Sequence, residues 1–417
     1  MTVVAGRALN APDPVSTAPL SRASSFSLPG RSSPDARASG GGWPVVREAR
    51  HGVTILRAHG TRFRPRRFAG RATNYLTYFA FANLASLGVG RPDVVVSLTD
   101  PPIIGLSALA TARRVGARFV FLCEDIFPEV ATLLEDFHNP AVNRALDRVN
   151  RYLLRHADAI VALGDRMRAR LVDEKGADAR RVRVIHNWSD CRAIVPGDKD
   201  NAFARAHGLA DRFVLMHSGN VGLSQNLEVL VEAADRLRAK ERLVVLIVGN
   251  GAKREALQRD AERRGLSNVR FLPYQPKDSL HELFASADAF LVSLEPGIEG
   301  YIVPSKVYGI LAAGRPYIAA VDPSCEAAQI AREYDCGLLA APNDPDDLAR
   351  RIASLYDDPA AVRSMGVNAR SAALRFDRRI AVRSYYELFA ELAPDTVHVR
   401  ADAAPPTVRL KADTTYK

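Results

Sequence analysis

The chain has 417 residues, which is enough for two domains with separate cores, and its 47% apolar and 25% charged residues are typical of a globular protein. Its formal net charge of +10 suggests an anionic partner, which is a nucleotide, a membrane surface or a nucleic acid. The basic residues are scattered and lack the interleaved aromatic residues that stack bases, which argues against nucleic acid. No apolar run reaches the roughly 20 residues of a spanning helix, and the first residues lack the order of a signal peptide, so we expect a cytoplasmic protein.

The cysteines indicate neither a disulfide framework nor a metal site. They form no C-x-x-C pair and have no histidines at metal-ligand spacing, so we expect free thiols and no bound metal. The cysteines are Cys123, Cys191, Cys325 and Cys336.

Both ends of the chain have a composition that predicts disorder. Residues 1–43 are rich in Ala, Ser, Pro, Gly and Arg without a sustained apolar period, and we expect the same behaviour from the tail at 395–417. The first candidate strand is then 52–57. Because a doubly wound domain begins with an apolar strand and a Gly-rich turn, we expect that the first βα unit is missing or that the chain starts differently from the native gene product.

A basic cluster precedes an apolar and aromatic segment at 75–82. An interfacial helix that touches anionic lipid headgroups, at the inner face of the plasma membrane, would use both features. A helix packed on its own sheet beside a solvated loop is the alternative. The basic residues are Arg62, Arg64, Arg66, Arg67 and Arg71.

From residue 91 onward, short β-branched runs alternate with longer helical patterns at the spacing of βαβ units, which predicts parallel sheets. The runs of the first half are 93–98, 118–123, 158–163 and 182–186. The runs of the second half are 213–217, 243–248, 269–272, 289–293, 317–320 and 337–340.

A polar passage at 187–200 separates the two halves. We therefore predict an N-terminal domain at 44–195, a C-terminal domain at 196–376 and a helix at 377–394 that returns towards the N-terminal domain. Both domains are predicted to be doubly wound, with the functional site in the cleft between them.

The most informative stretch is VPSKVYGILAAGRP at 303–316, which follows a strand-like run and a loop that contains Gly and Pro. Pro304 presets φ for a first helical turn. The backbone N–H groups of Ser305, Lys306 and Val307 would then point out of the helix start, and Lys306 adds a full positive charge. This arrangement suits a diphosphate leaving group. A capped helix that only packs is the alternative.

Two glycine-bearing loops follow predicted strands of the second half. In HSGNVG, Gly219 and Gly222 flank Asn220 and would let the backbone come close to a ligand's phosphates. In VGNGAKRE, Gly249 and Gly251 close the next strand in the same way. Plain strand-to-helix turns are the alternative for both loops.

Polar and aromatic residues beside these loops complete the predicted ligand contacts. Lys253 and Arg254 enter the next helix, where they would clamp diphosphate oxygens as a point charge and a fork. In VRFLPY, Tyr274 stands at a strand end, where a base could lie against it. A solvated first helical turn is the alternative for the two basic residues.

With these motifs the chain resembles the family 4 glycosyltransferases, particularly those of bacterial O-antigen and exopolysaccharide assembly that carry a PSK motif. The motifs are HSGNVG, VGNGAKRE, VRFLPY and EPGIEGYIVPSKVYGILAAGRP, together with CEDIFPE in the first half. The resemblance covers 52–392 and implies a GT-B fold, in which two doubly wound Rossmann-like α/β domains face a cleft. It also implies a nucleotide-sugar donor held by the C-terminal domain, an acceptor-side N-terminal domain, retention of anomeric configuration and no required metal or cofactor.

The chain departs from the family pattern where many members carry two glutamates eight positions apart. Those places fall on Tyr301 and Gly309. Glu295 and Glu299 lie just upstream and are expected to reach the sugar instead, while Lys306 takes over part of the phosphate contact.

The resemblance also selects the residues expected to act. A histidine is often found at the place of Glu124, and its absence leaves Asp125 and Glu129 as the polar side chains at that strand end. The expected catalytic residues are Asp125, Glu299 and Lys306. The expected donor-binding residues are Gly219, Asn220, Gly222, Gly249, Gly251, Lys253, Arg254, Tyr274, Glu295, Pro304 and Ser305.

The function implied by the resemblance is a retaining hexosyltransferase that moves a sugar from a nucleoside-diphosphate sugar to a lipid-linked or glycan acceptor in cell-surface polysaccharide biosynthesis. In such a reaction charge grows on the phosphate oxygens while the sugar becomes oxocarbenium-like. The leaving phosphate itself would take the acceptor's proton on the same face. A GT-B nucleotide-sugar epimerase and a truncated, non-catalytic relic are the alternatives.

Overall fold

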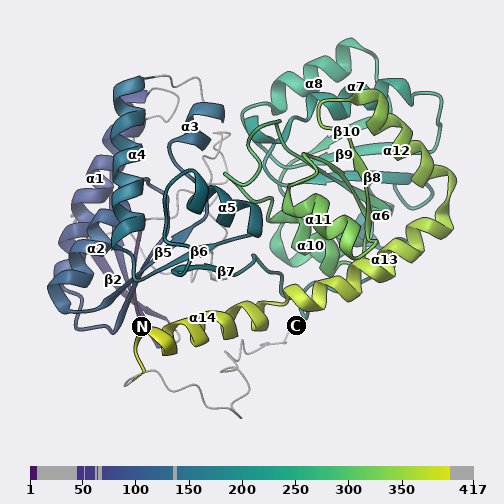
Figure 1. Cartoon of the computed structure of the whole chain (residues 1–417). Coiled ribbons are helices and arrows are strands. Elements are labelled where there is room, and N and C mark those ends of the chain that lie inside the picture. Colours follow the sequence, from purple (N-terminus) through teal and green to yellow (C-terminus); the bar gives the residue numbers. More distant parts are fainter. Residues whose placement is uncertain (7–44, 51, 62, 64–67, 135–138, 395–417) are drawn as a thin grey trace, which may run out of the picture.

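The computed structural model describes residues 1–6, 45–50, 52–61, 63, 68–134 and 139–394. They form two α/β domains that lie side by side, and helix α14 (Arg378–Leu392) runs from the C-terminal domain along the N-terminal domain (Figure 1). Within these residues no helix combines the length and the apolar content needed to cross a membrane. The cysteines named above are buried and form no disulfide.

The N-terminal domain contains two sheets. One has the order β1-β3-β2, with β1 parallel and β2 antiparallel to β3, and the other is parallel with the order β4-β5-β6-β7. The strands are β1 (Thr2–Gly6), β2 (Val45–Arg50), β3 (Val53–Ala58), β4 (Val94–Ser97), β5 (Arg118–Cys123), β6 (Ala159–Ala162) and β7 (Val182–Val184). The helices are α1 (Phe68–Leu87), α2 (Ile104–Val115), α3 (Glu129–Leu134), α4 (Pro140–His156) and α5 (Asp165–Asp173).

The start of the chain differs from the expectation of disorder. Residues 2–6 form β1, which pairs along its whole length with β3. The run Thr-Val-Val-Ala-Gly is short but mostly β-branched. Its pairing with β3 offsets the conformational entropy that the run loses when it becomes ordered. A first strand is therefore present, which the composition did not predict, whereas the rest of a first βα unit falls outside the described residues. The rest of 1–43, and 395–417, lie outside the described residues.

The C-terminal domain is built on one parallel sheet with the order β10-β9-β8-β11-β12-β13. Every residue of β9 is buried, as expected for a central strand that helices cover on both faces. The strands are β8 (Phe213–Ser218), β9 (Leu243–Val248), β10 (Val269–Leu272), β11 (Ala289–Ser293), β12 (Tyr317–Ala320) and β13 (Gly337–Ala340). Every strand predicted from residue 91 onward is confirmed, with small shifts at the ends.

Helices and short 3₁₀ turns connect these strands. The helices are α6 (Ala202–Ala206), α7 (Glu228–Arg236), α8 (Arg254–Arg263), α9 (Leu280–Ala285), α10 (Lys306–Ala312), α11 (Glu326–Glu333), α12 (Pro345–Asp357) and α13 (Pro359–Ala373). The 3₁₀ turns are η1 (Leu223–Gln225), η2 (Lys277–Ser279) and η3 (Leu374–Phe376).

The strand order places a topological switch point between β8 and β11. From β8 the chain moves outward through β9 to β10, and then it returns to β11 on the other side of β8 and moves outward to β13. The loops that leave the carboxyl ends of β8 and β11 therefore diverge. The crevice at such a point is where open α/β sheets bind ligands.

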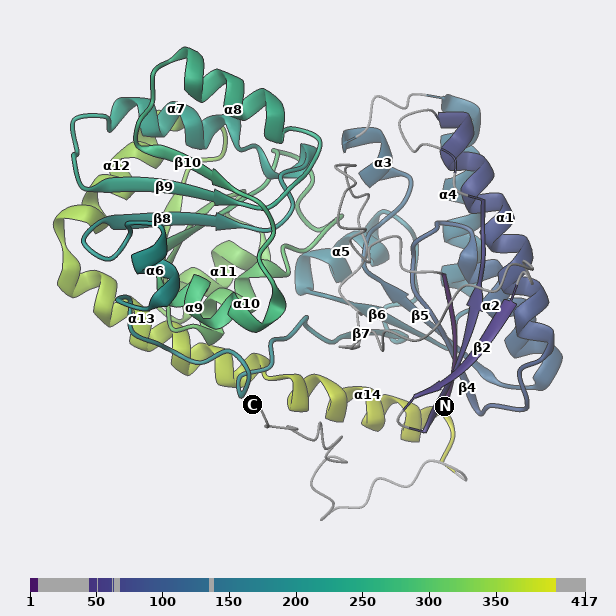
Figure 2. The ribbon, with the colours of Figure 1, turned by 180° about the vertical axis from the view of Figure 1, so that it is seen from behind.

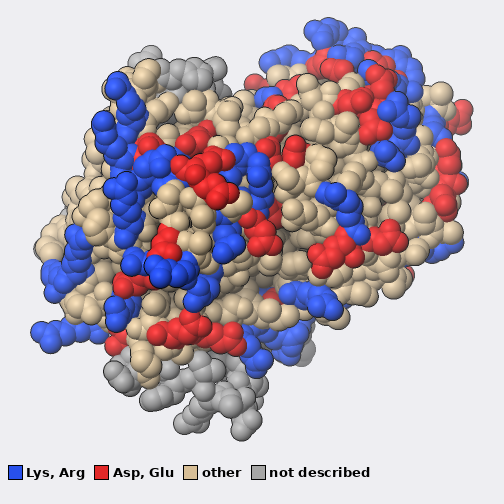
Figure 3. Space-filling model, in the orientation of Figure 1, with Lys and Arg blue, Asp and Glu red and all other residues tan. Residues whose placement is uncertain are grey.

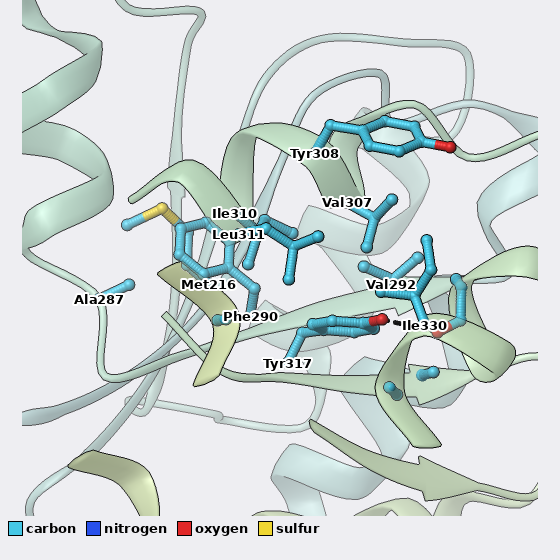
Figure 4. Packing of buried hydrophobic residues seen from close by; sticks show 14 of the residues in the cluster. Met216, Ala287, Phe290, Val292, Val307, Tyr308, Ile310, Leu311, Tyr317 and Ile330 are labelled. Atoms are coloured by element: carbon cyan, nitrogen blue, oxygen red, sulfur yellow. Dashed lines mark hydrogen bonds between the residues drawn. The ribbon is translucent and has the colours of Figure 1, made fainter. Parts of the chain in front are cut away.

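Helix α10, which follows β11, is anchored to the sheet by its apolar side. Its buried side chains are Val307, Tyr308, Ile310 and Leu311. In Figure 4, Val307, Ile310 and Leu311 point towards β11 and β12, whereas the ring of Tyr308 extends away from these strands. Below them, the hydroxyl of Tyr317 donates to the backbone oxygen of Ala327 at 2.6 Å. This packing anchors the body of α10, the helix that begins at Lys306, against the sheet.

The chain crosses between the domains twice, and the crossings are hydrogen-bonded to each other. The N–H of Ser189 donates to the carbonyl of Phe376 at 3.1 Å, and the N–H of Arg378 donates to the carbonyl of Ser189 at 2.9 Å. Beyond the second crossing, α14 runs along the N-terminal domain (Figure 2). Its Ala381 and Leu388 belong to the core of that domain. The domains are thus joined by a paired connection.

Candidate functional site

A buried lysine without a partner is the first feature of the candidate site. The Nζ of Lys306 is buried, although part of the residue remains accessible, and it makes no hydrogen bond within the part of the chain that the structure describes. Burial lowers the pKa of Lys306 from 10.5 to about 7. A buried ammonium group without a partner costs free energy, and an anion beside Nζ would remove that cost.

A neutral histidine lies near this lysine. His217, in β8, is fully buried, and its Nε2 lies 3.3 Å from the carbonyl oxygen of Asn220. A carbonyl only accepts, so Nε2 carries the proton. Burial, and then the charge of Lys306, hold the pKa of His217 well below its usual range. The pair therefore carries at most the single charge of Lys306, at the switch point of the sheet.

Close backbone contact explains two of the predicted glycines. Gly249 has a φ of +143°, and a Cβ placed on it would lie 1.8 Å from the carbonyl oxygen of Gly219. A Cβ on Gly251 would lie 2.2 Å from the carbonyl oxygen of Val221. The N–H of Val221 in turn donates to the carbonyl of Asn250 at 2.9 Å. The loops after β8 and β9 can touch because these positions lack side chains.

Gly249→Ala is expected to lower the free energy of unfolding by about 2–3 kcal/mol, because both the backbone conformation and the contact with the Gly219 carbonyl would be strained. Urea denaturation measures this change. Gly219→Ala is the matched control, since Gly219 has a similar φ of +136° but open space around a Cβ. Equal losses in the two variants would show that close packing contributes nothing.

The backbone amides of the first loop are engaged within the protein. The N–H of Gly219 donates to the carbonyl of Val248 at 2.9 Å, and the N–H of Gly222 donates to Oε1 of Gln225 at 3.0 Å. The side chain of Asn220 fills the space beside Gly222, with Nδ2 2.6 Å from the position of a Cβ. Both of these N–H groups hold the loop itself, and close approach of the loop backbone to a ligand's phosphates stays a prediction.

Lys253 is paired with carboxylates. Its Nζ lies 2.8 Å from Oε1 of Glu228 and 3.6 Å from Oε1 of Glu295. Lys253, which was predicted to contact diphosphate, is thus paired with Glu228 and, at a longer distance, with Glu295, which was predicted to contact the sugar. These residues lie at the edge of the same loops. A diphosphate would have to compete with these carboxylates for Lys253, whereas Lys306 has no such competitor among the described residues.

Arg254 is hydrogen-bonded to the loop after β9 and to the end of β10. Its Nη1 donates to the carbonyl of Gly249, to Oδ1 of Asn250 at 3.1 Å and to the carbonyl of Leu272 at 2.7 Å. Burial lowers the pKa of Arg254. This nitrogen therefore fixes the ends of β9 and β10, and a diphosphate contact of Arg254 stays a prediction.

Tyr274 lies beside the glycine loops, as its position after β10 predicts. Its hydroxyl donates to the carbonyl of Asn250 at 3.4 Å, and its ring lies 3.5 Å from the position of a Cβ on Gly249. The residue is 44% exposed, so a ring face remains accessible next to the loops.

The start of α10 differs in detail from the prediction. Pro304 is buried and Ser305 is exposed, and the helix begins at Lys306. The N–H of Val307 donates to the carbonyl of Pro304 at 3.4 Å, so this amide closes the turn and does not point to a ligand. The Nζ of Lys306 is thus a buried charged group at this helix start without a hydrogen-bond partner among the described residues, as is the neutral hydroxyl of Tyr308.

The two expected catalytic acids lie where the domains meet. Glu299 is 8% exposed, and its Oε1 accepts a hydrogen bond from Arg170 of α5 at 2.9 Å. Asp125 forms an isolated antiparallel bridge with Ile302. The next residue, Ile126, donates its N–H to the carbonyl of Tyr301 at 2.9 Å. The structure therefore brings the Asp125 segment and the Glu299 segment against the loop that leads to Lys306.

Sequence reasoning missed two residues of this region. Arg170 lies on an amphipathic helix rich in arginine, where nothing in the local pattern distinguishes a buried arginine from an exposed one. The other residue is His217, and the signal in the sequence that could have found it is a histidine at the end of the buried run of β8.

Two family models match the chain, one to each half. The model described as "Glycosyl transferase 4-like domain" matches residues 25–188, and the model described as "Glycosyl transferases group 1" matches residues 199–372. Among curated proteins, the probable glycosyltransferase WbjE of Pseudomonas aeruginosa is 29% identical over 66% of this chain and 68% of its own length. The putative colanic acid biosynthesis glycosyl transferase WcaI of Escherichia coli K12 is 35% identical over 39% of this chain and 40% of its own length.

Solved glycosyltransferase structures share the fold. HepE of Anabaena, in complex with UDP and glucose, superposes with a TM-score of 0.65 at 18% identity over 82% of this chain and 87% of its own. The sucrose-phosphate synthase of Thermosynechococcus elongatus has a TM-score of 0.66 at 20% identity over 86% of this chain and 87% of its own. With both halves matched, the chain carries a glycosyl transferase 4-like domain followed by a glycosyl transferases group 1 domain, and these two domains are arranged as in the GT-B fold.

Proposed function

We propose that the chain transfers a sugar from a nucleoside-diphosphate sugar to an acceptor, with retention of anomeric configuration, and that it is of the hexosyltransferase type. The observation that carries the proposal is the buried Nζ of Lys306 at the switch point of the C-terminal sheet, without a partner among the described residues. Charge grows on the leaving diphosphate in such a reaction, and a pre-placed cation stabilises it. The UDP in the HepE complexes supports a nucleoside diphosphate as the anion.

The contacts of Glu299 suit orientation of the sugar better than nucleophilic attack. Its carboxylate is already paired with Arg170 at 2.9 Å, and this pairing weakens it as a nucleophile. We propose that the leaving phosphate takes the proton of the acceptor hydroxyl on the face from which it departs. Asp125 is proposed to act on the acceptor side, because its segment abuts the donor loop at Ile302. No step of this reaction is assigned to a metal or cofactor.

We propose a lipid-linked or glycan acceptor in cell-surface polysaccharide biosynthesis. The support is the description of WcaI as a colanic acid biosynthesis enzyme and the name of WbjE as a glycosyltransferase. The matched part is only 40% of the length of WcaI, so we do not assign the acceptor of WcaI to this chain.

The deciding experiment measures nucleotide release from a panel of nucleotide-sugars, with and without a lipid-linked acceptor. A transferase releases nucleoside diphosphate in an acceptor-dependent manner, whereas an epimerase converts the nucleotide-sugar without any acceptor. A relic does neither. Mass spectrometry of nucleotide-sugars that remain bound to the purified protein identifies the donor, and NMR of the product identifies the anomeric configuration.

A membrane surface remains the proposed second partner. Arg62, Arg64, Arg66, Arg67 and the side chain of Arg71 lie outside the described residues. In the described part, the predicted aromatic segment lies in α1, where the most exposed apolar side chains are Leu76, Leu84 and Leu87 at 60%, 50% and 62%. Lys and Arg side chains also form a row along α4 (Figure 3). Its arginines are Arg144, Arg148, Arg151 and Arg155.

Binding to anionic vesicles is therefore expected at low salt and should be released by salt, because exposed charges are screened over about 8–10 Å at physiological ionic strength. Replacing the five cluster arginines of residues 62–71 by glutamine should abolish co-sedimentation. The control replaces Arg259 and Arg263, which are exposed on α8 of the other domain. Binding that is absent at low salt, or unchanged in the five-arginine variant, would contradict a role for the cluster.

A further inference from the structure

Helix α5 of the N-terminal domain is held by two loops of the C-terminal domain. In both views it lies at the edge of its domain that faces the C-terminal domain (Figure 1 and Figure 2). The first loop follows β11 and leads to α10, and the second follows β12 and leads to α11. Both loops leave the carboxyl edge of the sheet, which is also the edge of the candidate donor site.

The first contact centres on Arg170, which is 8% exposed. Its Nε donates to the backbone oxygen of Glu299 at 2.6 Å, and its Nη2 donates to Oε1 of the same residue at 2.9 Å. Its Nη1 donates to Oε1 of Glu174 at 2.7 Å. The guanidinium fork thus fixes both the backbone and the side chain of Glu299, which a point charge cannot do.

Tyr301 closes this arrangement from the side of the C-terminal domain. The guanidinium carbon of Arg170 lies 3.9 Å from the centre of the Tyr301 ring, and the Tyr301 hydroxyl donates to Oε2 of Glu174 at 2.7 Å. Burial, and then the hydrogen bond to Glu174, raise the pKa of Tyr301 to about 12, so the hydroxyl remains a donor at neutral pH. Arg170 is therefore enclosed by Glu299 and Tyr301 of one domain and Glu174 of its own.

The second contact is made by Glu326, the first residue of α11. It is 3% exposed and lies against Gly164, the residue that precedes α5, where a Cβ would come within 2.2 Å of Oε1. Burial raises the pKa of Glu326, while the amides of Arg166 and Met167 in the first turn of α5 act in the opposite direction. Neither carboxyl oxygen reaches hydrogen-bond geometry with any described residue. This contact is thus a close fit of shape and charge to the positive end of α5.

The first loop joins this contact to the candidate donor site. It carries Glu299 and Tyr301, and then it reaches Lys306 within a few residues. It also passes directly over α5, since a Cβ on Gly300 would lie 2.7 Å from Cγ of Arg166. The position of Lys306 is therefore tied to the other domain through a loop that is too short to absorb a large displacement.

We propose that Arg170 is a positioning residue, which holds the Glu299 loop so that Lys306 is correctly placed only when the two domains are closed on α5, with Glu326 against Gly164 as the second contact. This proposal rests on the proposed function. It makes domain closure and nucleotide binding a single event, because the same loop serves both. The loop that leads to the donor site of the C-terminal domain is thus held by an arginine of the N-terminal domain.

The test compares Arg170→Met, Arg170→Lys and a matched control, Arg168→Met, whose exposed side chain lies on the same helix. UDP affinity is measured by calorimetry, closure by small-angle X-ray scattering with and without UDP, and turnover by nucleotide release. Arg170→Met is expected to weaken UDP binding about tenfold, lower kcat about tenfold and enlarge the radius of gyration of the UDP complex. Arg170→Lys should recover part of the affinity, and Arg168→Met should match the wild type.

Unchanged UDP affinity and unchanged scattering in Arg170→Met would overturn the proposal while leaving the proposed function intact. A wild-type protein that binds no nucleotide would instead overturn the proposed function, and the positioning role with it. If Arg170→Met does not fold, Gly164→Ala decides the question, because Gly164 has an extended φ of −174° that alanine adopts freely. Its Cβ would push Glu326 away from α5. UDP affinity and scattering like those of the wild type in that variant would likewise overturn the proposal.

Discussion

Lys306→Met is expected to lower kcat/KM for sugar transfer by about 10²–10³, the range for loss of one group that stabilises transition-state charge. The Nζ of Lys306 is buried and has no partner among the described residues, so its charge is not already neutralised by the protein. Methionine keeps the apolar stem and removes only the charge. Steady-state kinetics with the identified donor, and calorimetry with UDP, measure the two parts of the effect.

The same substitution is expected to stabilise the protein without ligand, by on the order of 2 kcal/mol at pH 7. Folding lowers the pKa of Lys306 from 10.5 to about 7, so between these values the unfolded chain binds more protons than the folded one. The contribution of Lys306 to stability therefore rises with pH across this window, and it is unfavourable at neutral pH. Thermal unfolding should show a higher Tm for Lys306→Met than for the wild type.

Lys253→Met is the matched control, because Lys253 borders the same loops but is paired with Glu228 at 2.8 Å. Its effect on kcat/KM should be much smaller, and its Tm should not rise. Turnover and UDP affinity that are unchanged in Lys306→Met would contradict the assignment of Lys306. Equal losses in both lysine variants would show that general positive charge matters rather than this position.

The C-terminal domain was predictable because its central strands are buried on both faces. A run such as β9, with six buried residues and no polar interruption, is typical of a central strand in a parallel sheet that helices cover on both faces. The strand β1 was not predictable, because five residues within a segment dominated by Ala, Ser, Pro, Gly and Arg acquire their order from pairing with a distant strand. The composition of the segment gives no indication of that pairing.

The candidate site divides in the same way. Lys306 could be placed from its position two residues after Pro304, because a proline favours a helix start close by, whatever the order of the strands. The hydrogen bonds of the glycine amides could not be predicted, because the N–H of Gly219 donates to the carbonyl of Val248 and the register of the strands sets that partner. Arg170 and Glu299 are 129 positions apart, and only the packing of the two domains brings them together.

The affinity for UDP is expected to fall about tenfold for each pH unit above about 7, as Lys306 loses its proton in the free protein. A diphosphate beside Nζ stabilises the charged form, so the complex keeps the proton and binding above pH 7 takes one up. His217 does not contribute, because burial and Lys306 hold its pKa well below its usual range. The terminal phosphate of UDP ionises near pH 6, so measurements between pH 7.5 and 9 avoid it.

Calorimetry in two buffers of different ionisation enthalpy counts the protons, and about one per UDP is expected to be taken up at pH 8.5. Lys306→Arg is the sharpest control, because a guanidinium group stays charged throughout this range and its UDP affinity should not change with pH. Lys306→Met should bind weakly and also show no pH dependence. A wild-type affinity that is constant from pH 7.5 to 9, or a pH dependence that persists in Lys306→Arg, would mean that Lys306 is already charged in the free protein or does not contact the diphosphate.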